Sequence, residues 1–170
     1  MAFEPAQILV GAALGFASAL SLKWWAYRRD LWLSRVDNFC EAVDAAADVA
    51  SEYWLESRVD ADAALSRSLD LKEAKIIGLQ TRLDGLYASL EFDNPILEQR
   101  LSELRDALTG GNFNVANRDA DGERVRLVQT HASDLIVECR WAAYDAMGLW
   151  AFMKRLGHKI VYMPARRRRL

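Results

Sequence analysis

The sequence predicts an all-α fold: an N-terminal single transmembrane helix followed by an antiparallel, up-down four-helix bundle. Residues 6–22 are seventeen consecutive uncharged, mostly apolar residues. Four later segments repeat apolar residues at spacings of three and four, the period of an amphipathic helix. Segments rich in Gly, Asn and Asp separate them, and short connections favour antiparallel neighbours. We therefore expect an anchor over residues 1–29, a bundle over 30–157 and a basic tail over 158–170.

The anchor is predicted from its length and its flanks. Seventeen helical residues span about 25 Å, the short end of what crosses a hydrocarbon core. Aromatic residues follow at the expected membrane interface, and the basic pair after them favours a cytoplasmic location for the remainder of the chain. The predicted interface residues are Trp24, Trp25, Tyr27, Arg28 and Arg29. We therefore expect a single-pass membrane protein of the bacterial inner membrane, with its N-terminus outside and its C-terminal domain in the cytoplasm.

Two alternatives for this segment are a cleaved signal peptide and a buried core helix. Ala17-Ser18-Ala19 has the small-x-small pattern of a cleavage site. A signal peptide, however, carries basic residues before its apolar stretch, whereas this chain has Glu4 there and its basic residues on the other side. A buried helix is considered because the apolar run is short.

Small residues recur every fourth position within the apolar stretch, at Gly11, Gly15 and Ala19. This spacing places them on one stripe, where the backbone of a second membrane helix can approach closely. The stripe therefore predicts self-association of the transmembrane helix and a homo-oligomer.

The formal net charge is −2, but the charged residues are distributed unevenly along the chain. Residues 30–153 contain 23 acids and 12 basic residues, whereas residues 154–170 contain seven basic residues and no acid. An acidic body argues against nucleic-acid binding by that surface. Cys40 and Cys139 are the two cysteines and both fall on apolar helical faces, so we expect reduced core residues.

The first cytoplasmic helix is expected over residues 31–57, continuous with the anchor. Its apolar face consists of Trp32, Val36, Phe39, Cys40, Val43, Ala47, Ala50 and Trp54. Its opposite face consists of Asp37, Glu41, Asp44, Asp48 and Glu52. We interpret this acidic stripe as a solvated surface, with a cation or a basic partner as the alternative.

The second helix is expected over residues 62–92. Its heptad positions are Leu69, Ile76, Leu83 and Leu90, with Leu79 and Leu86 between them. Gly78 and Gly85 lie one heptad apart and predict a strip where a neighbouring helix sits close.

The third helix has clear predicted boundaries, and the fourth helix has a clear apolar seam. Asn94 is the expected N-cap and Pro95 the first residue of the third helix, which ends at Gly110-Gly111. The apolar seam of the fourth helix is Val125, Val128, Ala132, Leu135, Cys139, Ala142, Ala146, Leu149, Met153 and Leu156. Its small central residues predict a close approach of the facing helix.

An even number of bundle helices returns the chain to the bilayer. The tail then delivers Arg166, Arg167, Arg168 and Arg169 to the anionic inner leaflet, where each basic residue contributes about 1 kcal/mol. We expect a second membrane contact here, with RNA or DNA binding and an unstructured solubilising end as alternatives.

Motifs that could carry chemistry are few. Asn117-x-Asp119-x-Asp121-Gly122 resembles the start of an EF-hand calcium loop, but the twelfth position is Val128 and offers no ligand. Capping of the fourth helix by Asp119 or Asp121 explains these acids more simply. The sequence contains no Ser/His/Asp set, no P-loop and no Glu-x-x-His pair, so we expect no enzyme activity, cofactor or metal.

The connection over residues 110–122 is the best candidate for a partner or ligand site, with a plain flexible connector as the alternative. The leading functional hypothesis is an oligomerising, membrane-anchored interaction or scaffold module with a protein partner. The alternatives are a membrane-perturbing effector of bacterial toxin or defence type, triggered through its cytoplasmic domain, and a small-ligand sensor.

Overall fold

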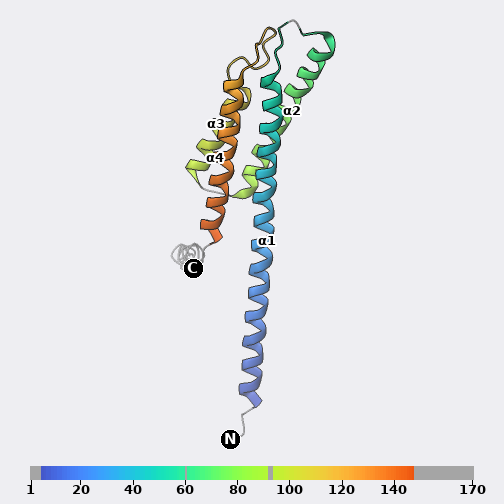
Figure 1. Ribbon diagram of the computed structural model, residues 1–170. Coiled ribbons are helices and arrows are strands. Elements are labelled where there is room, and N and C mark those ends of the chain that lie inside the picture. The colour runs from blue at the N-terminus through green and yellow to red at the C-terminus, as the bar shows by residue number, and fades with distance from the viewer. Residues whose placement is uncertain (1–4, 60, 92–93, 148–170) are drawn as a thin grey trace, which may run out of the picture. The chain divides into compact units, whose positions relative to one another are not determined.

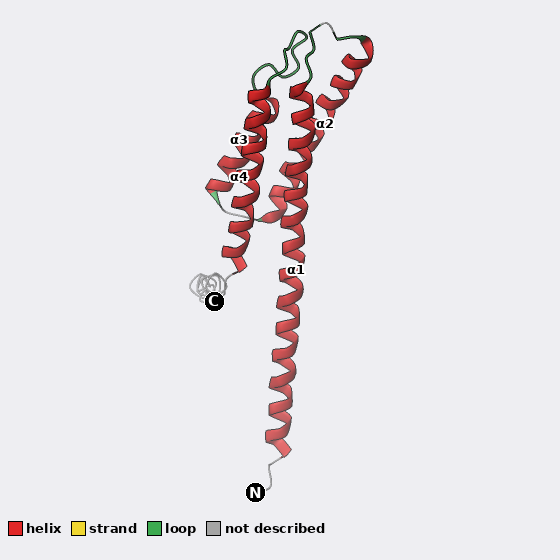
Figure 2. Cartoon of the chain, in the orientation of Figure 1, coloured by secondary structure: helices red, strands yellow, loops and turns green. Residues whose placement is uncertain are grey.

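The computed structural model describes residues 5–59, 61–91 and 94–147, with the side chains of residues 5–13 and 147 left out. These ranges form four helices: α1 (Pro5–Leu55), α2 (Ala63–Leu90), α3 (Pro95–Thr109) and α4 (Gly122–Met147). Loops join them, and no strand occurs in the described ranges (Figure 1, Figure 2). The prediction of an all-helical protein compatible with a helical bundle is therefore confirmed.

The chain divides into two compact units, Met1–Ser34 and Arg35–Leu170. The core of the second unit is built from the expected helical faces. The heptad of α2 is fully buried at Leu69, Ile76, Leu83 and Leu90. Residues 36–54 of α1 bury a wider face than expected, because Ala42, Ala46 and Tyr53 join the predicted positions. This part of α1 thus packs against the other helices over a wide face, and its predicted acidic stripe stays exposed: Asp37, Glu41, Asp44, Asp48 and Glu52.

Side-chain contacts fix the direction of each helix in the second unit. Arg35, early in this part of α1, bonds to the carbonyl of Ser89 at the end of α2, whereas Tyr53 contacts Glu73 near its start. Ser51 of α1 contacts Gln129, early in α4. Consecutive helices and the α1–α4 pair therefore run antiparallel.

Helix ends follow the predicted capping chemistry. The Asn94 side chain accepts from the backbone N–H groups of Ile96 and Leu97, and Pro95 begins α3. The Asp62 carboxylate caps α2 in the same way. These caps satisfy backbone donors that have no partner within the helix.

The predicted close approach at two glycines of α2 is wrong within the described structure. A Cβ atom added at Gly78 or Gly85 would meet no atom within 4 Å, so no described helix covers them. The seam of α4 is nearly as predicted, except that Ala143 is buried more deeply than Ala142. Its predicted continuation to Leu149, Met153 and Leu156 lies outside the described residues.

The first unit is the N-terminal part of α1, whose described side chains run from Leu14 to Ser34. Large apolar residues there are exposed, including Phe16 at 68%. The Arg28 and Arg29 guanidinium groups lie over the Trp24 and Trp25 rings, 4.9 and 5.5 Å from the centroids. Across the described residues, no helix is long and apolar enough to span a bilayer.

Candidate functional site

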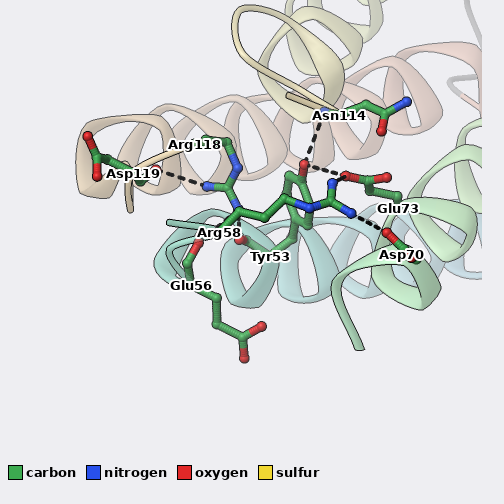
Figure 3. Close-up of polar contacts among 8 residues, drawn as sticks. All are labelled: Tyr53, Glu56, Arg58, Asp70, Glu73, Asn114, Arg118 and Asp119. Atoms are coloured by element: carbon green, nitrogen blue, oxygen red, sulfur yellow. Dashed lines mark hydrogen bonds and ion pairs between the residues drawn. The ribbon is translucent and has the colours of Figure 1, made fainter. Parts of the chain in front are cut away.

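The loop between α3 and α4 is held against the end of α1 by a buried arginine. Arg118 is 2% exposed, and its Nη2 donates to the carbonyls of Tyr53 at 2.7 Å and Glu56 at 2.8 Å. Its Nη1 donates to the Trp54 carbonyl at 3.4 Å, and Figure 3 shows the guanidinium directed at this end of the helix. The carbonyls at a helix C-terminus lack intrahelical donors and carry partial negative charge, so a buried cation is favourable there.

Aromatic rings complete the surroundings of this guanidinium. It lies 4.3 Å from the centroid of the Tyr53 ring and 4.9 Å from that of Trp54. Phe113, from the same loop as Arg118, packs on both rings. Arg124 at the start of α4 lies over the Trp54 ring at 5.3 Å. Desolvated cation–π contacts of this kind contribute about 2 kcal/mol each, which adds to the hydrogen bonds.

A second polar chain joins the same loop to α2 (Figure 3). The Asn114 backbone N–H donates to Tyr53 Oη at 3.1 Å, and Tyr53 Oη donates to Glu73 at 2.8 Å. Arg58 bridges Glu73, at 2.7 Å, to Asp70. Burial raises the pKa of the Tyr53 phenol, against the Asn114 hydrogen bond, which lowers it. The phenol therefore stays protonated as the donor to Glu73.

Hydrogen bonds therefore hold the loop between α3 and α4 in a defined position. Arg58 N–H donates to the Arg118 carbonyl and Asp121 N–H to the Trp54 carbonyl, at 2.7 and 2.8 Å. Residues 114–117, between the packed Phe113 ring and the buried Arg118, are exposed. The interpretation of residues 110–122 as a plain flexible connector does not fit this bonding. The buried groups bond to one another, so the cluster acts as a clamp that displays residues 114–117.

The structure explains the acidic residues of the EF-hand-like segment without calcium. The Asp121 carboxylate accepts the Arg124 backbone N–H at 2.8 Å and so caps α4, as the capping interpretation expects. Within the described residues, no group of three or more His, Cys, Asp or Glu side chains is placed to hold a metal ion.

A second surface of interest is the outer face of α2. One stripe of this helix consists of six exposed, uncharged residues: Leu71, Ala74, Gly78, Thr81, Gly85 and Ala88. They cover about 25 Å along the helix. Exposed charged residues border this stripe, namely Lys75, Arg82 and Asp84. Gly in a helix interior costs about 1 kcal/mol relative to Ala. The two exposed glycines therefore lower the stability of α2, and no contact in the described structure compensates for this loss.

The predicted site residues fall in three places. Gly15, Ala19, Trp24, Trp25, Tyr27, Arg28 and Arg29 lie in the first unit and are half-exposed or exposed. An added Cβ at Gly15 meets no atom within 4 Å. Gly11 lies in the part of α1 for which only the backbone is described, and the tail residues Arg166, Arg167, Arg168 and Arg169 lie outside the described residues.

Sequence reasoning missed the residues that hold the loop: Arg118, Glu73 and Tyr53. Arg118 stands among polar loop residues, and Glu73 occupies a position that the α2 heptad leaves to solvent. The one available signal was the length of the loop itself. No protein-family model matches the chain, and no curated protein or solved structure is detectably similar to it.

Proposed function

We propose that the protein is a membrane-anchored interaction module that self-associates through its helices and presents the 114–117 loop tip to a protein partner. The observation that carries the proposal is the uncovered, uncharged face of α2. A face of this length with two glycines suits the close packing of a second helix, and the chain's own described helices leave it open. We infer that the α2 face of a second copy covers it.

The anchor part of the proposal rests on the first unit of the chain. Its described residues expose large apolar side chains, with Leu14 and Leu22 both at 67%. Exposed Trp and Tyr rings follow, each of which has an apolar body and a polar tip suited to the headgroup region. Lipid is the environment in which such a helix is stable with its apolar side chains uncovered.

The loop tip supports the partner part of the proposal. The loop tip lies at the end of the second unit that contains Trp54. Arg35, the first residue of this unit, lies at its opposite end. A rigid loop loses less conformational entropy on binding than a flexible one, so the clamp around Arg118 favours recognition.

Self-association is tested by replacing Gly78 and Gly85 with Lys. Lysine is a better helix former than glycine, so the fold should be retained, while a long charged side chain keeps a second helix away. We expect a loss of the oligomer in cross-linking and light scattering of the full chain in mild detergent. Ser68→Lys, on another exposed side of α2, is the matched control. An unchanged oligomer in the Gly78→Lys/Gly85→Lys variant would refute the α2 interface.

The anchor is tested separately by fractionation of the native chain. We expect it in the membrane pellet after an alkaline carbonate wash, with a C-terminal reporter active only in the cytoplasm. Recovery of the intact chain in the soluble fraction would refute the anchor without affecting the test of the α2 face.

The loop tip is tested with a photo-crosslinking amino acid. We expect a discrete adduct when it replaces Val115 and none when it replaces Val59, which is equally exposed in the neighbouring loop. The same adduct pattern at both positions would argue against a specific partner at residues 114–117.

A further inference from the structure

The two cysteines face each other inside the second unit. Cys40 of α1 is 3% exposed and Cys139 of α4 is fully buried. The helices are antiparallel, and Ser51 bonds to Gln129 at 2.8 Å. Eleven residues back along α1 and ten forward along α4 therefore lead to the same level, so the two buried cysteines lie at matching heights on neighbouring helices.

The small residues at this level are the two cysteines themselves, and Ala143 follows one turn after Cys139 on α4. On α1, Val36 and Val43 lie one turn before and after Cys40 and are buried. A disulfide needs Cα atoms about 4.4–6.8 Å apart, which facing helices reach only where their contact residues are small. The pair is free in this structure, so it is in the dithiol state.

The two thiols are chemically different. The hydrogen bond with Cys139 lowers the pKa of Cys40, and the Arg140 guanidinium lowers it further, against burial and the Asp37 carboxylate, which raise it. The hydrogen bond with Cys40 and burial raise the pKa of Cys139. Of the two buried thiols, Cys40 is thus the one whose thiolate is favoured, because the Arg140 guanidinium lowers its pKa.

We propose that Cys40 and Cys139 form a redox-active pair that is oxidised by hydrogen peroxide to an intramolecular disulfide joining α1 to α4. The Cys40 thiolate attacks one peroxide oxygen, the O–O bond breaks, and hydroxide leaves and is protonated to water. Cys40 then carries a sulfenic acid. The Cys139 sulfur attacks the Cys40 sulfur, the S–O bond breaks and a second water leaves. Two thiols are oxidised and one peroxide is reduced to two waters.

Both cysteines are buried, so peroxide, which is small, reaches Cys40 through local opening of the helices, whereas a larger disulfide reagent would need a wider opening of the bundle. The disulfide would close a loop of about 100 residues, the length for which a cross-link constrains the unfolded chain strongly. Oxidation would therefore lock the bundle and oppose any rearrangement that separates α1 from α4.

The test treats the purified full chain, in mild detergent, with hydrogen peroxide. We expect a peptide cross-link between Cys40 and Cys139 by mass spectrometry under non-reducing conditions, reversed by a thiol reductant. The melting temperature should rise by about 5 °C or more. In Cys139→Ser the Cys40 sulfenic acid should persist and react with a dimedone probe. Oxidation of both sulfurs to sulfinic or sulfonic acids without a cross-link would overturn the proposal, as would inert thiols in the folded chain.

Arg140→Gln separates activation from packing, because Arg140 is exposed and its replacement leaves the core intact. We expect oxidation of Cys40 to slow severalfold, because loss of the guanidinium raises the pKa of this thiol and reduces its thiolate fraction. Arg126→Gln, at another exposed position of α4, is the control and should react at the parental rate. Equal rates of Cys40 oxidation in the two variants would overturn the role of Arg140. The Cys40–Cys139 cross-link can be measured whether or not the proposed membrane function is correct.

Discussion

Replacing Arg118 with Ala should be among the most destabilising single changes in the second unit. The substitution removes the donors to the Tyr53, Trp54 and Glu56 carbonyls and the cation over two aromatic rings. Hydrogen bonds that involve a charged group contribute about 1.5–3 kcal/mol each, and a buried acceptor left without a donor costs about 1–3 kcal/mol. Such terms are not additive within one cluster. We expect a loss of about 4 kcal/mol in the free energy of unfolding, a large part of the 5–15 kcal/mol typical of a domain.

The assay is urea unfolding of the full chain in mild detergent, followed by far-UV circular dichroism. Arg118→Lys should lose about half as much, because one ammonium group cannot reproduce the planar fork that reaches several carbonyls. Arg126→Ala is the matched control: this arginine is exposed, and its loss should change stability by no more than about 0.5 kcal/mol.

Hydrogen exchange of the loop gives a local readout of the same change. The Asn114 amide is bonded to Tyr53 and should exchange faster in Arg118→Ala, because the loop loses its second attachment to α1. A loss of stability below about 1 kcal/mol, with unchanged exchange at Asn114, would refute the clamp.

Three further variants test other parts of the fold. At protein concentrations low enough to keep the chain monomeric, Gly78→Ala and Gly85→Ala should each stabilise the helix by about 0.5–1 kcal/mol in urea titrations, since the added methyl meets open space within one copy; a loss of stability in the monomer would contradict the open face. Asn94→Ala should cost about 1 kcal/mol by removing the cap of α3, and a neutral result would contradict that cap. The raised pKa of Tyr53 predicts that its stabilising contribution is fully present below pH 10 and is lost as pH rises through the folded value. Tyr53→Phe should therefore unfold with a weaker pH dependence above pH 10, and an identical profile would contradict this assignment.

The helices and their boundaries could be predicted because local rules determine them. The α2 heptad that runs from Leu69 to Leu90 is buried at each of its four predicted positions. Asn94 and Pro95 mark the start of α3 for reasons that lie within three residues of chain. Periodicity and capping depend on neighbours in sequence, so a single sequence contains the information.

The loop clamp could not be predicted because its parts meet only in three dimensions. Arg118 is surrounded in sequence by polar residues typical of an exposed loop, and its burial depends on carbonyls more than 60 residues away. Glu73 is buried where Tyr53 donates a hydrogen bond to it and Arg58 supplies the opposite charge. The two glycines of α2 were expected to lie beside a neighbouring helix, but periodicity identifies a face without identifying what covers it.

The length of the loop follows from the end of α1. The last turn of this helix contains no basic residue, and its final carbonyls require donors from elsewhere. The loop supplies them from the Arg118 side chain and from the Asp121 N–H, which bonds to Trp54. A direct turn from α3 to α4 would leave those acceptors buried without partners. Residues 118–121 are therefore the cap of α1 as well as part of a connection between two other helices, and the chain reaches them through the exposed residues 114–117.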